Sequence, residues 1–272
     1  MFRINPCSRF YASAALGRIF RRNVFHFLLS VGIYYTMDKK AWFFRNIVAN
    51  LAIVAVLAVT AAYLYLDDSA PVSLNEPIYK GSSATRVSLM VNVSLGTEHV
   101  ADMLRIFKEN DVRTTFFVGG SWAAEHNETL REIFDGGFEI GNHGYFQKDH
   151  KKLSPQRSRE EIELTHKLVR SVTGCEMSLF APPSGSFSKS VMEGAKELGY
   201  TTILWSKDTL GGDTGSAPII TERAMRDLTG GDLILMQPTR ETVAALPDII
   251  RIIRAAGLSI APVSEVIKVT AD

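Results

Sequence analysis

Residues 113–145 read RTTFFVGGSWAAEHNETLREIFDGGFEIGNHGY, and this stretch decides the fold. The runs 113–118 and 138–142 are short, apolar and bounded by polar residues or glycine, which predicts two strands. Between them, the segment from Trp122 to Phe134 predicts a helix, and Gly136-Gly137 is a typical stop signal. A crossover connection that contains a helix joins parallel strands, so we expect a parallel sheet here.

The alternation of strands and helices extends to both sides of this stretch. Further strands are expected at 87–93, 179–183, 201–205, 232–236 and 258–263. Further helices are expected around Val100 to Phe107, from Ser154-Pro155 to Gly174, near 188–198 and from Pro247 to Ala256. Such repeated units predict an α/β barrel or a doubly wound sheet. In both folds the ligand binds at the carboxyl ends of the strands.

Five blocks of the sequence occur in an order typical of one known family. They are RTTFFVGGSW, FDGGFEIGNHGY, LFAPPSGSFS, TILWSKDT and GDLILMQPT. Together they resemble the polysaccharide-deacetylase domain of carbohydrate esterase family 4, over residues 86–268. The sequences of these motifs are most similar to those of the sporulation-type branch. The resemblance implies a distorted (β/α) barrel of about seven parallel strands with outer helices. It also implies metal-dependent removal of N-acetyl groups from a glycan.

The family's chemistry needs an activated water, a stabilised oxyanion and a proton for the leaving amine. The resemblance implies one Asp and two His, spaced i and i+4 on a helical turn, as metal ligands. It also implies a second Asp as base, an Arg that supports it and a late His as acid. At these positions the chain has Ser94 (base), Leu95 (metal Asp), Gln147 (second His), Ala181 (Arg) and Gln237 (acid). Serine at its normal pKa is no base, leucine binds no cation and a glutamine amide exchanges no proton near neutral pH. No catalytic set is therefore expected to be intact.

His143 is the metal ligand of the family that the sequence retains. Because a zinc hydrolase keeps three protein ligands, we expect no metal cofactor. His150 is too far from His143 to share a metal if the segment is helical, at about 10.5 Å along the axis. A site rebuilt with His99, Asp149 or Asp213 stays open as an alternative, with zinc or another divalent metal as the cofactor. The residues expected to line the substrate groove are Asn92, His143, Tyr145, Pro183, Ser184, Trp205 and Asp208.

The run from Ile47 to Leu66 (IVANLAIVAVLAVTAAYLYL) is uncharged and long enough to span a bilayer core. Residues 1–45 hold eight basic side chains against one acidic side chain, which predicts a cytoplasmic N-terminus. We expect a single-pass protein of the cell membrane with these parts: a cytoplasmic segment 1–46, a signal-anchor helix 47–66, an outer tether 67–85 and an outer domain 86–268. A cleaved signal peptide is the alternative. Residues 1–36 are interpreted as preceding the true start codon, Met37.

Charge and cysteine content exclude some classes of protein. The whole chain carries +1, and the excess of seven basic residues in 1–45 leaves −6 on residues 46–272. An acidic outer part argues against a nucleic-acid partner. Cys7 and Cys175 lie on opposite sides of the membrane in the expected topology, so no disulfide is expected.

The sequence thus predicts a catalytically inactive, membrane-anchored protein that binds or scaffolds cell-wall or spore glycan. One alternative is an active metal-dependent deacetylase of peptidoglycan or chitooligosaccharide with a rearranged site. The other is a protein-interaction module that binds no glycan. Metal content distinguishes the active enzyme from the other two functions, and glycan binding distinguishes those two from each other.

Overall fold

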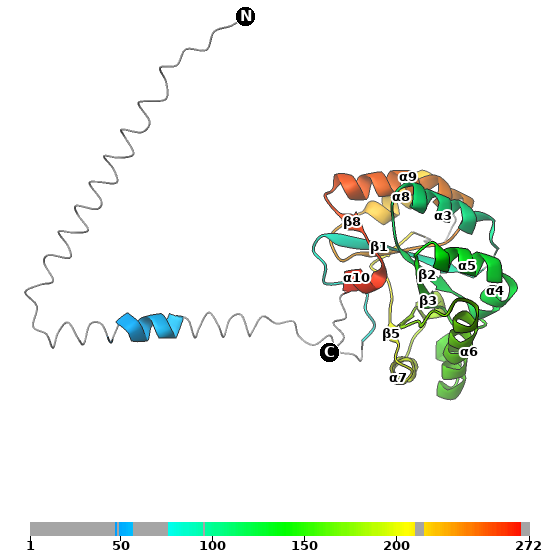
Figure 1. Cartoon of the computed structure of the whole chain (residues 1–272), viewed down its shortest axis with the longest axis horizontal. Coiled ribbons are helices and arrows are strands. Elements are labelled where there is room, and N and C mark those ends of the chain that lie inside the picture. The colour runs from blue at the N-terminus through cyan, green and yellow to red at the C-terminus, as the bar shows by residue number, and fades with distance from the viewer. Residues whose placement is uncertain (1–46, 48, 57–75, 95, 210–214, 268–272) are drawn as a thin grey trace, which may run out of the picture. The chain divides into compact units, whose positions relative to one another are not determined.

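The computed structural model describes residues 47, 49–56, 76–94, 96–209 and 215–267 (Figure 1). Internal contacts divide the chain into two units, Met1–Ser69 and Ala70–Asp272. In the first unit, residues 47 and 49–56 are helical, and the remainder of the expected span, 57–66, lies outside the described residues. Among the described residues, no helix is both long enough and apolar enough to cross a membrane.

The second unit is built on a parallel sheet with the strand order β5-β4-β3-β2-β1-β7-β6, and β8 also pairs with β1. The strands are β1 (Arg86–Val93), β2 (Thr115–Val118), β3 (Glu139–Asn142), β4 (Leu179–Phe180), β5 (Thr201–Thr202), β6 (Lys207–Asp208), β7 (Leu233–Met236) and β8 (Ser259–Ile260). All of their pairings are parallel. The sheet curls into a half-barrel with helices outside it, which confirms the predicted parallel α/β fold (Figure 1).

The helices cover the outer side of this sheet, except for the last, Val263–Ile267, whose buried residues pack inside the half-barrel. They are α3 (Glu98–Glu109), α4 (Gly120–Glu125), α5 (Asn127–Asp135), α6 (Pro155–Thr173), α7 (Lys189–Glu197), α8 (Ala217–Met225), α9 (Arg240–Ala255) and α10 (Val263–Ile267). Figure 1 shows α3, α8 and α9 side by side, in agreement with their contacts. Short 3₁₀ turns at His150–Lys152 and Pro183–Gly185 lie in the loops that follow β3 and β4.

Two of the expected helices differ from the prediction. The helix expected from Trp122 to Phe134 is divided into α4 and α5, because His126 leaves the helical conformation at φ −128° and ψ 50°. Helix α9 begins well before Pro247, since the Thr239 hydroxyl accepts a hydrogen bond from the Thr242 amide and caps the first turn. A proline inside a helix was thus misread as a helix start.

The strands near prolines are also shorter than expected. β4 ends at Phe180 because Pro182 and Pro183, which follow, have no amide hydrogen for a ladder. The run 258–263 contributes only two residues to β8, and Val263 begins α10 instead. Lys207 and Asp208 form the short strand β6, although they were expected to lie in a loop. They have none of the apolar character that predicts a strand.

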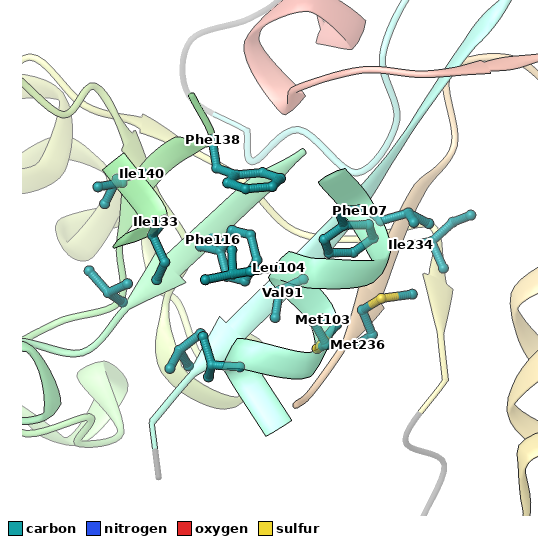
Figure 2. Packing of buried hydrophobic residues seen from close by; sticks show 14 of the residues in the cluster. Val91, Met103, Leu104, Phe107, Phe116, Ile133, Phe138, Ile140, Ile234 and Met236 are labelled. Carbon is teal, nitrogen blue, oxygen red and sulfur yellow. The ribbon is translucent and has the colours of Figure 1, made fainter. Parts of the chain in front are cut away.

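The core has two layers, because successive strand residues point to opposite faces of the sheet. On β1, the odd-numbered residues 87–93 pack under the helices, together with residues of α3, α5 and α9. Figure 2 shows part of this outer layer, where Phe107, Phe116 and Phe138 have ring centroids 5.3–6.1 Å apart. The inner layer fills the half-barrel and includes Met90 and Phe117.

Part of the expected tether belongs to the folded unit. Ile78 forms a parallel bridge with Ile203, directly after β5, and Lys80 forms an antiparallel bridge with Asp232, directly before β7. The Lys80 ammonium also lies 3.2 Å from the Asp232 carboxylate. The two bridges adjoin β5, at one edge of the sheet, and β7, next to the other edge. The packed domain therefore begins before the predicted boundary at residue 86.

Candidate functional site

The carboxyl ends of strands β1 to β4 lie in register. The residues paired across these ends are Val93, Val118, Asn142 and Phe180. The positions directly after them are Ser94, Gly119, His143 and Ala181. Parallel pairing therefore brings three of the predicted site positions to one edge of the sheet, where this class of fold binds its ligands.

His143 is buried at this edge, with 5% of its surface exposed. Its Nδ1 atom lies 2.7 Å from the carbonyl oxygen of Ala181. A carbonyl oxygen only accepts, so Nδ1 carries the hydrogen and Nε2 keeps its lone pair. Burial lowers the pKa of His143 to about 4; the Ala181 hydrogen bond raises it and the charge of His150 lowers it. His143 is therefore a neutral imidazole at physiological pH.

Gln147 returns to the end of β1, although the segment between it and His143 is not helical. Its Nε2 atom donates to the carbonyl oxygen of Ser94 at 3.4 Å and fills the space that a side chain on Gly119 would take. The backbone of Gln147 is left-handed, with φ +53°. The expected i, i+4 helical turn is thus wrong for this segment, yet the loop still brings position 147 to Ser94. Leu95 lies outside the described residues.

His150 is fully buried, but it belongs to the other side of the sheet. Its Nδ1 atom lies 2.7 Å from the Ser158 hydroxyl of α6, and its ring packs on Phe180 with centroids 5.2 Å apart. Phe180 is part of the outer layer, whereas Ala181 is part of the inner layer. The segment is a loop rather than a helix, so helical spacing does not set the place of His150. Its Nδ1 atom faces helix α6, while its Nε2 atom lies next to Gly144 and has no hydrogen-bond partner among the described residues.

A buried carboxylate on helix α6 fixes the backbone of the loop after β3. Glu161 of α6 is fully buried, and its Oε2 atom accepts the Phe146 amide hydrogen at 2.6 Å. Its other oxygen lies 3.7 Å from the Arg157 guanidinium. Sequence reasoning missed Glu161, although polar residues at the helical spacing of Ser158, Glu161 and Thr165 follow the buried side of α6.

The loops after β3 and β4 are tied to each other. The Ser186 hydroxyl donates to Oδ1 of Asp149, which also accepts the Lys151 amide hydrogen at 3.1 Å. The Ser186 hydrogen bond lowers the pKa of Asp149, against a small desolvation effect, and Lys152 lowers it further. Asp149 is thus used as a structural link between two loops.

The predicted groove residues of the β4 and β5 loops also meet. Ser184 is exposed and left-handed, with φ +56°. Trp205, which is half-buried, packs so closely on Gly185 that a Cβ atom there would lie 2.8 Å from the indole ring. Pro183 lies in van der Waals range of Gly144. The half-buried Tyr145 packs edge-on against Phe146, with ring centroids 4.7 Å apart.

The strand order sets where the remaining predicted site residues lie. Asn92 is 6% exposed, and its Oδ1 atom has no hydrogen-bond partner among the described residues. Gln237 follows directly after β7, which pairs with β1, so its backbone lies at the same edge of the sheet. Asp208 is exposed on β6, where it pairs with Leu235 of β7. Asp213 lies outside the described residues.

A metal ion of the kind that the resemblance implies does not fit the residues present. His143 offers one neutral nitrogen, Ser94 and Gln147 offer groups that stay un-ionised, and zinc hydrolases use three protein ligands. In the part of the chain that the structure describes, no three His, Cys, Asp or Glu side chains gather in a cluster that could hold a metal. Position 95 lies outside that part, and leucine offers no ligand atom there.

Comparison with known proteins finds similarity over most of the second unit. The profile of the family described as polysaccharide deacetylase matches residues 80–203. YlxY of Bacillus subtilis (strain 168) is 34% identical over 196 residues, which cover 72% of this chain and 61% of YlxY. The peptidoglycan-N-acetylglucosamine deacetylase PgdA of Listeria monocytogenes is 29% identical, with 65% of this chain and 38% of PgdA covered. The chain thus spans less than two thirds of each of these relatives.

Solved structures show the same similarity. Wild-type BA3943 from Bacillus anthracis, described as a CE4 family pseudoenzyme, superposes with a TM-score of 0.69 and 32% identity, covering 71% of this chain and 69% of that chain. A mutant of BA3943 with restored enzymatic activity superposes equally well, at 31% identity. Bacillus subtilis PdaA, a family 4 carbohydrate esterase at 22% identity, shares the fold with a TM-score of 0.66.

Proposed function

The chain belongs to the polysaccharide deacetylase family, carbohydrate esterase family 4, and we propose that it is a membrane-anchored member that binds cell-wall or spore glycan without hydrolysing it. The glycan is proposed because PgdA is named for its action on peptidoglycan. The loss of hydrolysis is proposed from the residues at the strand ends of this chain.

The contact between Gln147 and Ser94 carries this proposal. The loop brings the Gln147 amide to the backbone carbonyl oxygen of Ser94, so the positions of the second metal histidine and of the base lie together while their side chains are an amide and a hydroxyl. Neither group is ionised near neutral pH, and neither can take a proton from water as a base. A positioned general base contributes about 10²–10⁴-fold to a rate, and the site lacks that contribution.

His143 and Gln237 support the same conclusion. The Nδ1 hydrogen of His143 is held by Ala181, and a single remaining nitrogen is one ligand of the three that zinc needs. The Gln237 amide cannot deliver a proton to a leaving amine. BA3943, which is similar in sequence and fold, is itself described as a pseudoenzyme.

The carboxyl edge of the sheet carries side chains that are suited to contact a sugar. Trp205, packed on Gly185, and Tyr145, packed on Phe146, are half-buried aromatic side chains near the carboxyl edge. Aromatic rings with one exposed face and a fixed orientation are suited to cover the apolar face of a sugar ring.

The uncharged run 47–66 with its basic flank supports an anchor whose outer side carries the glycan-binding domain. Alkaline phosphatase fused after residue 90 should be active, because that enzyme folds outside the cytoplasm. Activity of a cytoplasm-only reporter at the same position would overturn this topology.

The function is tested on the purified full chain with N-acetylglucosamine oligomers. We expect binding by calorimetry, no release of acetate and no stoichiometric zinc by elemental analysis. Acetate release that stops with a chelator would identify an active deacetylase with a rearranged site. A folded chain that binds neither these oligomers nor purified cell-wall fragments would point to a protein-interaction module.

A further inference from the structure

Four polar side chains form a continuous chain of hydrogen bonds from the outer surface beside α6 to the loop after β3. The Oε2 atom of Glu176 lies 3.0 Å from Nε2 of His166, and Nδ1 of His166 lies 2.6 Å from the Tyr200 hydroxyl. The Tyr200 hydroxyl lies 3.2 Å from Nδ2 of Asn142, and Oδ1 of Asn142 accepts the Gly144 amide hydrogen at 2.9 Å. We call Glu176, His166, Tyr200 and Asn142 the relay.

The relay runs from the solvent into the core. The side chain of Glu176 is 59% exposed and that of His166 is 24% exposed, whereas Tyr200 and Asn142 are buried. Burial raises the pKa of Tyr200 to about 12, although the hydrogen bond from Asn142 lowers it, so the hydroxyl keeps its hydrogen at neutral pH. A buried polar group that loses its partner is costly, so the inner members of the relay depend on each other.

The orientation of the Asn142 amide is fixed by backbone groups on both of its sides. The amide of Gly144 only donates, so it must face the side-chain oxygen of Asn142. The carbonyl oxygen of Ile162 only accepts, and it lies 2.8 Å from Nδ2 of Asn142. Nδ2 therefore donates one hydrogen to Ile162 and the other to the Tyr200 hydroxyl.

This orientation sets the direction of the outer hydrogen bonds. Because the Tyr200 oxygen accepts from Asn142, its own hydrogen is free to go to Nδ1 of His166. The hydrogen of the neutral His166 imidazole must then be on Nε2, where the Glu176 carboxylate accepts it. Every donor in the relay thus has an acceptor, and only one tautomer of His166 satisfies all of them.

The inner end of the relay lies between two of the predicted groove residues. Gly144 follows His143 and precedes Tyr145, and its backbone is left-handed, with φ +72°. The carbonyl oxygens of Gly144 and Tyr145 accept the amide hydrogens of Gly120 and Ser121, both at 2.9 Å. The amide of Gly144 depends instead on a side chain for its partner, and the relay holds that side chain.

We propose that the relay positions the glycan site from outside the groove, by fixing the Asn142 amide and with it the turn at Gly144 that carries His143 and Tyr145. This inference rests on the proposed glycan binding and adds positioning residues that touch no ligand. Neither Tyr200, which precedes β5, nor His166, which lies on α6, belongs to the carboxyl edge of the sheet. Their removal should nevertheless weaken binding at that edge.

The first test reads the relay itself, by nitrogen-15 NMR of the full chain at pH 8. We expect the hydrogen of His166 on Nε2, and Tyr200→Phe, which removes the donor to Nδ1, should move part of it to Nδ1. The same variant should accelerate exchange of the Gly144 amide hydrogen about two- to tenfold, as expected for one hydrogen bond. A wild-type hydrogen on Nδ1 overturns the direction of the relay, and an unchanged Gly144 exchange rate overturns the coupling to the turn.

The second test measures the affinity for an N-acetylglucosamine tetrasaccharide by calorimetry. Tyr200→Phe and His166→Leu should each weaken binding about two- to tenfold, and if Tyr200→Phe fails to fold, the partly exposed His166 still carries the test. The matched control is Ile250→Val, a buried position on α9 outside the relay, where the loss of one methylene costs a similar amount of stability. It should keep the wild-type affinity and the wild-type tautomer of His166.

The outcomes separate the positioning role from the proposed function. Unchanged affinity in the folded relay variants, or an equal loss of affinity in Ile250→Val, overturns the positioning role and leaves glycan binding intact. A folded wild type that does not bind the tetrasaccharide overturns the proposed function instead. In that case the exchange rate of the Gly144 amide still decides whether the relay holds the turn.

Discussion

His150 should make the domain less stable in mild acid. It is fully buried between Phe180 and α6, and burial lowers its pKa from an ordinary value of 6.5 to about 4, although the charge of Asp149 raises it. In the unfolded chain the same imidazole is in water and takes up a proton near its ordinary pKa. Between these two values the unfolded state binds more protons than the folded state, so stability falls as pH decreases.

The size of the effect follows from the two pKa values. Above pH 6.5 His150 is neutral in both states and costs nothing. At pH 5 the unfolded chain is almost fully protonated at this residue and the folded chain is mostly neutral, which removes about 2 kcal/mol of the free energy of unfolding. The loss is complete only below the folded value of about 4.

The assay is urea unfolding of the wild type and of His150→Gln at pH 7.5 and at pH 5. The variant loses the contact with Phe180, so we expect it to be about 1–2 kcal/mol less stable at pH 7.5. At pH 5 that difference should shrink by about 2 kcal/mol, because only the wild type carries the cost of the buried His150 imidazole, whereas the cost of the buried His143 imidazole is common to both proteins. His99→Gln, on the partly exposed face of α3, controls for the substitution itself. A difference that stays the same at both pH values would refute the reasoning.

Two further predictions concern the site and the loop. The first is a combined variant that carries Ser94→Asp, Leu95→Asp, Gln147→His and Gln237→His. It should bind zinc stoichiometrically by elemental analysis, because it returns ionisable ligands to strand ends that the fold already brings together, and a mutant of the similar protein BA3943 has restored enzymatic activity. A folded variant without zinc would show that the positions are assigned wrongly. Gly144→Ala, at φ +72° and with its new Cβ 2.9 Å from His150, should lower the free energy of unfolding by about 1–3 kcal/mol in urea. Gly174→Ala has φ +77° and an open surrounding, so an equal loss there would mean that the contact with His150 costs nothing.

The sequence was sufficient to predict which residues meet at the carboxyl edge of the sheet, because strand ends follow from composition. The apolar runs that become β1, β2, β3 and β7 fix which residues come directly after a strand. In a parallel sheet those residues must share one edge, so the sequence alone places Ser94, His143 and Ala181 together. Helix α6 was equally predictable from the Ser154 cap and the left-handed Gly174 at its end.

The sequence could not show which face of the sheet a loop residue would approach. His150 follows His143 in the same loop, yet it packs under α6, whereas Gln147, between them, returns to the groove. This path depends on two left-handed residues, Gly144 and Gln147, and on the Glu161 carboxylate below. Each of these is a tertiary feature, and helical spacing alone gave the wrong geometry.

The neutral residues at the strand ends also bear on the stability of the fold. A cluster of acidic side chains beside a buried imidazole is stable only with a cation to balance it, since unpaired buried charges are costly. In this chain the described positions hold neutral side chains, and two of them bond to the backbone: Gln147 donates to the Ser94 carbonyl oxygen and His143 donates to the Ala181 carbonyl oxygen. We therefore expect the free energy of unfolding of the domain to be the same with and without a chelator, because no buried charge in the described part of this edge requires a cation.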